Sequence, residues 1–416
     1  MATGGSVQLS LTRSASGGVS PPFSRLALNG KLELPALSTV GLFAGIGGIE
    51  AGLEKVGHET TALCEIDEGA VAVLEKHFPG VPVHRDVTAL KSVPRGAQLL
   101  TAGFPCQDLS QAGQTKGISG ARSGLVGHVF RLLEKRKVPW ILIENVPFMM
   151  QLGRGRALDV IICELEQLGY RWAYRVVDTL AFGLPQRRER VFLLASRKGD
   201  PRAVLFADDA GEPPPRRPTR RRAFGFYWTE GVRGLGTAVD AVPTLKGGSA
   251  LGIPSPPAIV LPSGRVVTPD IRDAERLQGF EPDWTLPAQS KRRRAGHRWK
   301  LVGNAVTVNV AEWIGFRLRA PGEYDSSWDV PLPRGTRWPN AAWGNGSQRF
   351  ASRVSRQPFA VEGPPIHKFL QFEKRDLSER ATGGFLRRLR SGSLRRPDWF
   401  ERLLEQHIEK MTRREG

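Results

Sequence analysis

The chain has 416 residues, of which 40% are hydrophobic and 24% are charged. This balance allows a sizeable buried core and excludes a wholly disordered chain, a coiled coil and a small disulfide scaffold. Lysine and arginine number 60 against 41 aspartate and glutamate residues, so the formal net charge is +19, which indicates a polyanionic partner, nucleic acid before membrane.

The N-terminal segment, residues 1–36, is rich in serine and glycine, and we expect a mobile tail there. It lacks the apolar stretch of a signal peptide, and no run in the chain approaches the roughly 18 apolar residues of a membrane span. Cys64, Cys106 and Cys163 are too few and too scattered for a disulfide framework or a cysteine zinc site. We therefore expect a reducing, cytoplasmic location, no membrane association and no metal site.

Between residues 37 and 195, short apolar runs alternate with amphipathic segments. The predicted strands are Ser38–Phe43, Thr60–Cys64, Gln98–Ala102, Trp140–Ile143, Tyr174–Asp178 and Arg190–Ala195. The predicted helices are Gly48–Val56, Gly69–His77, Leu125–Arg136 and Ala157–Leu168. This alternation predicts an α/β domain with a mainly parallel sheet and helices on both of its faces.

The pattern changes after Ser196. Gly211–Arg222 is so rich in proline and arginine that it cannot form the interior of a helix or strand, and residues 196–302 read as a small, loop-rich domain. Apolar periodicity returns at Ile271–Phe280 and Val306–Leu318. Residues 321–416 form a basic C-terminal extension that ends in a predicted amphipathic helix, Trp399–Met411.

A glycine loop, Phe43–Gly48, joins the first predicted strand to the first helix. Glycines let the backbone approach a ligand, and the helix N-terminus offers free N–H groups. Glu65 ends the next strand, where an acid can bind ribose hydroxyls, and Asp86 follows a third strand, where it can accept from an adenine amino group. A tight turn is the alternative for the loop alone; the three features together indicate a nucleoside cofactor.

Polar residues also follow the later strands. Cys106 lies in a Pro-Cys turn at a strand end, followed by a stretch rich in glycine, serine and glutamine, which is a typical place for a nucleophile. Glu144 ends the next strand, and Gln186–Arg190 precedes the last one. The alternatives are a buried structural cysteine, a solvated strand end and a solvated arginine cluster.

The blocks FAGIGG, GFPCQ, ENV, QRRER, ERLQGF and GNAVTVNVAEWIG occur in this order between residues 38 and 316. In this order they resemble the DNA (cytosine-5)-methyltransferase family. The resemblance implies a Rossmann-like sheet that uses S-adenosylmethionine, a smaller loop-rich DNA-recognition domain and a C-terminal extension. On this division, residues 37–195 form the catalytic domain, completed by 303–320, and residues 196–302 recognise the target.

The resemblance also implies catalytic roles. Cytosine C5 is a poor nucleophile, so the Cys106 thiolate would add to C6 and activate C5 toward the methyl group of the cofactor. Glu144 would bind the N3 and amino edge of the base, which favours a carboxyl with a raised pKa. Arg188 matches the arginine that contacts the cytosine O2, and Arg190 would support the strand or the glutamate.

For the cofactor, the resemblance places the glycine loop around the methionine moiety, Glu65 on the ribose, Ile66 on the adenine face, and Asp86 with Val87 on the adenine edge. Pro105 would form a wall, and two residues of the late GNAV block would close the carboxylate end. The residues so assigned are Phe43, Gly45, Ile46, Gly47, Gly48, Glu65, Ile66, Asp86, Val87, Pro105, Asn304 and Val306.

The expected partner is double-stranded DNA, from which the target base must be flipped out. Gln107 and Ser110 are the candidate contacts in the loop after the cysteine. Residues 37–195 contain 18 basic and 16 acidic side chains, whereas residues 196–416 contain 39 and 24. Phosphate contacts are therefore expected outside the catalytic core. The candidates are Arg216, Arg217, Arg220, Arg221 and Arg222, with a solvated linker as the alternative.

Two departures limit the resemblance: Glu281 follows ERLQGF where the family commonly has proline, and the extension is absent from minimal members. The extension could enlarge the DNA-reading surface, or it could stabilise the fold. The expected activity is methylation of a specific duplex site by a prokaryotic monomer, with a restriction endonuclease as a candidate partner. A tRNA methyltransferase, an inactive DNA-binding homologue and a dinucleotide oxidoreductase are the alternatives.

Overall fold

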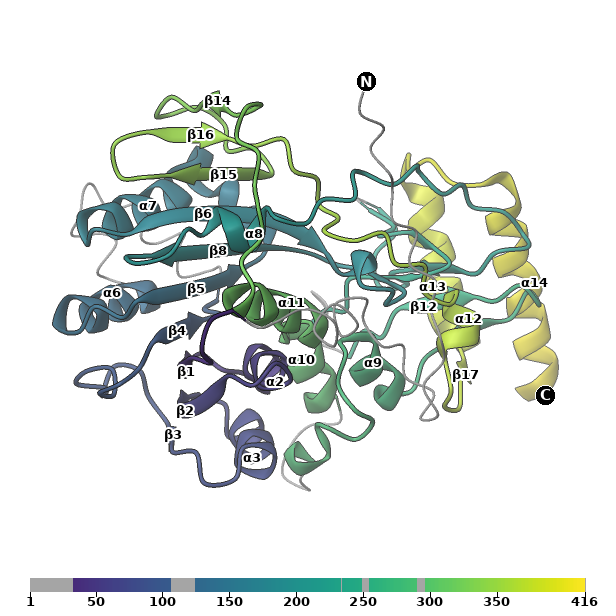
Figure 1. Ribbon diagram of the computed structural model, residues 1–416. Helices are drawn as coiled ribbons and strands as arrows, with labels where there is room; N and C mark the ends of the chain where they lie inside the picture. The colour runs from purple at the N-terminus through teal and green to yellow at the C-terminus, as the bar shows by residue number, and fades with distance from the viewer. Residues whose placement is uncertain (1–32, 106–123, 233, 249–253, 290–295, 416) are drawn as a thin grey trace.

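The computed structural model describes residues 33–105, 124–232, 234–248, 254–289 and 296–415. Two sheets organise these residues, a large one and a small one, each covered by helices (Figure 1). The large sheet has ten strands, in the spatial order β14 (Val330–Pro331), β16 (Arg349–Ala351), β15 (Ala341–Gly344), β6 (Arg171–Asp178), β8 (Glu189–Ser196), β5 (Trp140–Asn145), β4 (Leu99–Ala102), β1 (Ser38–Leu42), β2 (Glu59–Cys64) and β3 (Val83–His84).

The strand directions divide this sheet into two halves. Strands β1 to β5 pair in parallel, as the sequence predicts. From β8 to β14 every pairing is antiparallel, so the expectation of a mainly parallel sheet is wrong for this half. The reason is that residues 179–188, between β6 and β8, contain no helix long enough for the crossover that a parallel return needs.

Helices cover both faces of the large sheet. Neighbouring residues of β5 point to opposite faces: Ile141 and Ile143 pack with α6 (Leu125–Lys135) and α7 (Arg156–Gln167), and Leu142 packs with the helices of the other face. Those helices are α2 (Gly48–Glu54), α8 (Arg202–Leu205) and α11 (Val308–Arg319). The expected three-layer α/β architecture is confirmed within the described residues.

The order of the strands defines the edge at which a ligand can bind. The chain runs from β1 outward through β2 to β3 and then returns to β4 on the other side of β1, adding β5 beyond it. Such a reversal opens a crevice at the carboxyl ends of the two central strands. The glycine loop follows β1 and the Phe104-Pro105 turn follows β4, so both lie at this edge.

The small sheet has five strands and two covered faces. Its order is β10 (Ala238–Val239), β9 (Phe224–Phe226), β12 (Ala258–Val260), β13 (Val266–Thr268) and β17 (Arg375–Asp376). One face packs on α9 (Ile271–Leu277), α10 (His297–Asn304) and α12 (Ile366–Phe369). The other packs on α13 (Glu379–Ser391) and α14 (Asp398–Glu415), the yellow pair in Figure 1.

Residues 321–416 contribute to both sheets. Strands β14 to β16 extend the large sheet beyond β6, whereas β17, α13 and α14 belong to the small one. A further parallel pair, β7 (Gln186–Arg187) with β11 (Val242–Pro243), joins the QRRER block to the stretch of chain between β10 and β12. Residues 211–219 form neither helix nor strand, as their proline content predicts.

Candidate active site

The glycine loop between β1 and α2 is strongly turned. Phe43, Gly45 and Gly47 all have positive φ angles, of 55°, 56° and 78°. A Cβ atom at Gly45 would meet nothing within 4 Å, so the loop is open to a ligand there. A Cβ atom at Gly48 would lie 2.3 Å from the carbonyl oxygen of Val306, which shows how closely the late GNAV block approaches the loop.

Glu65 holds this loop from the end of β2. Its Oε2 accepts a hydrogen bond from the Gly45 N–H (2.8 Å), and its Oε1 accepts from the N–H groups of Ile66 (2.9 Å) and Asp67 (2.8 Å). Each carboxylate oxygen keeps acceptor capacity for a further donor such as a hydroxyl. The Ile66 side chain is 75% exposed beside it, an apolar surface next to an acid.

Asp86 and Val87 follow β3 and face different environments. Asp86 is exposed and accepts from the Thr88 N–H (2.8 Å) and hydroxyl (2.7 Å), and these bonds hold the pKa of the Asp86 carboxyl below its usual value. Val87 is buried, and its carbonyl accepts from Arg131 (3.1 Å). The backbone of residues 86–88 is therefore held both by the Asp86 side chain and by the bond from Arg131 to the Val87 carbonyl.

The GNAV block ends α10 and lies between the two sheets. Asn304 is exposed, and its Oδ1 would be 2.3 Å from a Cβ atom at Gly247, in the segment that follows β11. Val306 is buried and contacts the glycine loop through its carbonyl. Of the two residues expected at the carboxylate end of the cofactor, Val306 thus lies against the glycine loop and Asn304 against the segment that follows β11.

The turn after β4 is fixed by the ENV block. Asn145 donates from Nδ2 to the carbonyl of Phe104 (3.0 Å) and accepts at Oδ1 from the Val146 N–H (2.9 Å). Phe104 is buried against Phe43, whereas Pro105 is exposed. The expected nucleophile Cys106 and the expected DNA contacts Gln107 and Ser110 lie outside the described residues.

Glu144 ends β5 and is 7% exposed. Burial raises the pKa of its carboxyl, while the positive charges of Arg190 and Arg188 lower it. The Arg190 Nε lies 3.1 Å from Glu144 Oε1, so the expected support of the glutamate by Arg190 is confirmed. A Cβ atom at Gly103 would be 3.5 Å from Glu144 Oε2, so the carboxyl faces the strand end that leads to Pro105.

Arg188 has a different set of partners. It is 1% exposed, and its Nη1 donates to the carbonyl of Leu245 (3.0 Å), while Nη2 donates to those of Gly303 (3.1 Å) and Ala305 (2.6 Å). Its backbone N–H donates to Asp178 Oδ1 (3.0 Å). Arg188 therefore joins the last core strand to the GNAV block and to the segment after β11.

The candidate phosphate-binding arginines lie on the surface. Arg222 pairs with Asp240 at 3.2 Å, and the other four are exposed: Arg216, Arg217, Arg220 and Arg221. A cleft of about 980 Å³ leads from the carboxyl-end edge of the large sheet, at Pro147 and Arg190, to the proline-rich segment Pro213–Arg216. Residues 356–364 of the extension form another wall of this cleft.

The sequence reasoning missed a buried polar network inside the motif blocks. Gln186 donates to the carbonyl of Leu277 (2.9 Å) and to Gln278 Oε1 (3.2 Å), and it accepts from the Leu245 N–H (2.9 Å). Gln278 Oε1 also accepts from the Thr307 hydroxyl (2.9 Å). The available signal was that a glutamine or threonine stands in each of the QRRER, ERLQGF and GNAVT blocks.

No group of three or more metal-binding side chains that could hold an ion was found among the residues that the structure describes. Over the same ranges, no helix is long and apolar enough to cross a membrane.

Comparison with known proteins places this chain in a family. Residues 37–223 match the model of the C-5 cytosine-specific DNA methylase family. The Type II methyltransferase M2.BsuMI of Bacillus subtilis (strain 168) is 49% identical over 363 residues, covering 85% of this chain and 93% of that protein. The Type II methyltransferase M.NlaX of Neisseria lactamica is 30% identical over 311 residues, covering 68% and 96%. The S. pombe Dnmt2 methyltransferase structure has 16% identity and a TM-score of 0.48, covering 68% and 98%. The chain therefore belongs to the C-5 cytosine-specific DNA methylase family.

Proposed function

We propose that the protein transfers a methyl group from S-adenosylmethionine to C5 of a cytosine in a specific duplex DNA sequence. One observation carries this proposal: the buried Glu144–Arg190 pair joins β5, the strand next to β4, to β8, at the edge where β4 leads through Pro105 toward Cys106. A carboxyl and a guanidinium held together beside a strand end can recognise one flipped-out base.

The residues at the edge of the sheet fit the proposed cofactor. Gly45 leaves open space over the loop, Glu65 keeps acceptor capacity for ribose hydroxyls, and Ile66 offers an exposed apolar face to a ring. S-adenosylmethionine supplies an electrophilic methyl group when it is bound. The proposed contacts for its adenine edge are Asp86 and Val87, and those for its carboxylate end are Asn304 and Val306.

Cys106 is the proposed nucleophile. Its thiolate forms a bond to C6 of cytosine, and the electron pair of the C5–C6 double bond then becomes available at C5, which takes the methyl group. A base removes the C5 proton, the C5–C6 double bond forms again, and the cysteine leaves as a thiolate. Asn145 supports this role because it fixes the Phe104 carbonyl two residues before the cysteine.

Glu144 and Arg190 are proposed to hold the base during this reaction. A protonated Glu144 can donate to N3 as negative charge develops on the ring, and its raised pKa favours that form. Arg190 contacts Glu144 and is the better placed arginine for the cytosine O2, because both terminal nitrogens of Arg188 bond to backbone carbonyls. Arg188 is proposed as the residue that positions this strand.

The proposed partner is one DNA duplex bound by a monomer, with the target base flipped into the site. Residues 196–302 are proposed to read the sequence, and a cognate restriction endonuclease is the proposed companion. The relatives named as Type II methyltransferases support this biological setting.

Transfer of a labelled methyl group from S-adenosylmethionine tests the proposal. We expect duplex DNA to be labelled and tRNA not to be, with bisulfite sequencing of DNA from expressing cells showing one recurring site. Cys106→Ser should abolish transfer while binding of S-adenosylmethionine persists. Labelling of tRNA alone would contradict the DNA substrate, and transfer by Cys106→Ser would contradict the covalent route.

A further inference from the structure

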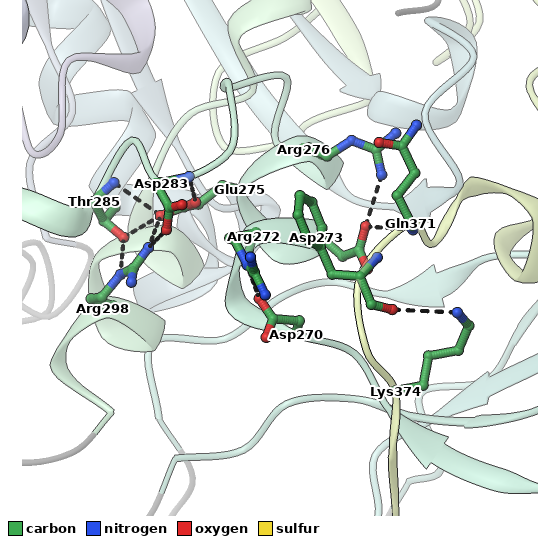
Figure 2. Close-up of polar contacts among 11 residues, drawn as sticks. Asp270, Arg272, Asp273, Glu275, Arg276, Asp283, Thr285, Arg298, Gln371 and Lys374 are labelled. Atoms are coloured by element: carbon green, nitrogen blue, oxygen red, sulfur yellow. Dashed lines mark hydrogen bonds and ion pairs between the residues drawn. The ribbon is translucent and has the colours of Figure 1, made fainter. Parts of the chain in front are cut away.

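The helix α9 carries two buried acids that bond in opposite directions (Figure 2). Asp273 accepts from the N–H groups of Gln371 (3.0 Å) and Phe372 (3.1 Å) and pairs with Arg276 (2.7 Å). These contacts anchor the C-terminal extension. Glu275 faces the other way, toward the loop that follows the helix.

Glu275 fixes the backbone on both sides of Trp284. Its Oε2 accepts from the Asp283 N–H (2.6 Å), and its Oε1 accepts from the Thr285 N–H (2.9 Å) and hydroxyl. Arg298 completes the group: it donates to Glu275 (2.9 Å), to Asp283 (3.1 Å) and to the Thr285 hydroxyl (2.8 Å), as Figure 2 shows. Asp283 has a φ angle of 65°, a conformation that costs a non-glycine residue free energy, so the buried carboxylate stabilises a turn that would otherwise be disfavoured.

Trp284, held in this way, reaches the glycine loop. Its indole Nε1 donates to the carbonyl of Ile46 at 2.9 Å. Its ring stacks on His77 with 3.6 Å between centroids and an interplanar angle of 7°, and its own carbonyl bonds to His77 Nε2 (2.9 Å). The indole is therefore locked against α3 (Glu68–His77) while its N–H points at the loop.

The Ile46 carbonyl sets the orientation of one peptide plane in the loop. Gly45 and Gly47 flank it, and both have positive φ angles, so this backbone can change conformation at little steric cost. The same peptide carries the Gly47 N–H, which donates to the Ala44 carbonyl (2.9 Å). A donor fixed on the Ile46 oxygen keeps the peptide from rotating and preserves the loop before a ligand arrives.

We propose that Trp284 is a positioning residue for the cofactor site, with Glu275 as the group that holds it in place. The inference rests on the proposed function, because it concerns the loop assigned to S-adenosylmethionine. It gives the ERLQGF block and the loop after it a role: they keep the methionine end of the site preorganised.

Trp284→Phe is the direct test, because phenylalanine keeps an aromatic ring against His77 while it removes the indole donor together with the five-membered ring that carries it. We expect the dissociation constant for S-adenosylmethionine, measured by calorimetry, to rise about tenfold, as for the removal of one hydrogen bond to a buried acceptor. KM for the cofactor should rise in parallel, with kcat and DNA affinity within about twofold. Hydrogen exchange of the peptide that contains residues 44–48 should become faster in the protein without ligand.

The matched control is Trp299→Phe, an equally conservative change in a partly buried tryptophan of α10, which should leave both measurements unchanged. Glu275→Gln provides a second variant, in which one of the two flanking N–H groups loses its acceptor and the other keeps only a neutral one. It should shift binding and exchange in the same direction as Trp284→Phe. Unchanged affinity and unchanged exchange in Trp284→Phe would overturn the inference. If the wild-type protein fails to bind S-adenosylmethionine, the proposed function is contradicted, and the exchange comparison still decides the role of Trp284.

Discussion

Arg188 and Arg190 lie two residues apart in one motif and have different partners. Arg190 has a carboxylate as its partner, Glu144, whereas Arg188 has three backbone carbonyls from two separate segments. A guanidinium can bridge several acceptors at once because its donors form a rigid planar fork. Loss of Arg188 should therefore affect folding, and loss of Arg190 should affect chemistry.

Arg188→Met should lower the free energy of unfolding by at least about 3 kcal/mol, because three buried carbonyls lose their donor. Arg190→Lys keeps a positive charge near Glu144 and should change that free energy by less than about 1 kcal/mol, while methyl transfer falls about 100-fold or more. Urea unfolding and single-turnover methyl transfer separate the two effects. Equal losses of stability in the two variants would contradict the assignment of Arg188 to folding and Arg190 to chemistry.

Glu50 is another buried acid, on α2, the helix that follows the glycine loop. It is 1% exposed; Oε1 accepts from the Thr101 hydroxyl (2.8 Å), and Oε2 has no hydrogen-bond partner within the described residues. Burial raises the pKa of Glu50 to about 7. The folded protein thus keeps a proton that the unfolded chain has lost between about pH 4.5 and pH 7.

Glu50→Gln should make stability less dependent on pH. A raised pKa in the folded state gives stability that is present below the unfolded pKa and is lost as pH rises through the folded value. Relative to wild type, the free energy of unfolding of the variant should therefore rise between pH 4.5 and pH 7 and then level off, by about 3 kcal/mol in total. Glu54→Gln, an exposed position on the same helix, is the control. Parallel pH curves for wild type and Glu50→Gln would contradict this account.

At the scale of elements, α13 and α14 are part of the small sheet's core. Phe400 of α14 is fully buried and lies against the rings of Phe224 (5.3 Å between centroids), Phe226 (5.2 Å) and Phe385 (6.2 Å). Two of these rings belong to β9 and one to α13. The apolar face of the sheet and the apolar stripes of both helices meet at this one side chain.

Phe400→Ala should lower the free energy of unfolding by about 3–5 kcal/mol, the usual cost of removing a large buried ring. Trp328→Ala, at a side chain that is 64% exposed, should change it by less than about 0.5 kcal/mol. Urea unfolding followed by circular dichroism measures both. If Phe400→Ala unfolds like the exposed control, the two helices are not part of the cooperative core.

At the scale of the whole molecule, the excess positive charge lies mostly outside residues 37–195, the segment that contains the glycine loop, Glu144 and Arg190. Most of the excess lies in residues 196–416, where Arg216, Arg217, Arg220 and Arg221 are exposed in the proline-rich segment. Arg216 also lines the cleft that begins at Arg190. Each phosphate that the protein neutralises releases counterions, so it steepens the fall of DNA affinity with salt. The slope of that dependence therefore reports how many phosphates the protein binds.

Changing Arg216, Arg217, Arg220 and Arg221 together to glutamine should reduce the salt slope of DNA binding by about one unit for each phosphate that is no longer neutralised. Fluorescence anisotropy from about 50 to about 200 mM salt measures the slope, and methyl transfer at saturating DNA should be retained. The control set removes four exposed cations that precede the starts of β4 and β5, at the opposite edge of the sheet: Lys91, Arg95, Lys135 and Lys137. Equal salt slopes for the two variants would indicate that the proline-rich segment is a solvated linker that does not bind phosphates.

The sequence predicts the elements that have strong periodicity and misses those that have none. The helix expected at Ala157–Leu168 is α7, Arg156–Gln167, because its apolar residues recur on one face and Gly169 ends it. The strands of the extension are two to four residues long, too short for any period to show. The predicted strands leave only residues 179–189 between Asp178 and Arg190, too short for a helical crossover, yet the alternation pattern alone does not show that β8 therefore runs antiparallel to its neighbours.

The site was predictable only in part, for a related reason. Motif order brings Glu65, Glu144 and the glycine loop to one edge, and the structure places them there. The partners of a buried side chain depend on segments far away in the chain, as for Arg188 with Leu245 and Ala305. Nothing in the QRRER block distinguishes Arg188 from the other arginines in it. Trp284 lies outside all of the motif blocks.

The entry of the extension into both sheets has a consequence for exchanging specificity between relatives. The small sheet takes strands from residues 224–268 and its last strand and outer helices from residues 366–415. A chimera that transplants only the first segment would leave an apolar face without its matching helices. If residues 196–302 read the target as proposed, a transplant of specificity must therefore carry two stretches of chain that lie about 100 residues apart. The helix α9, with its anchoring Asp273, would have to be kept together with the second stretch.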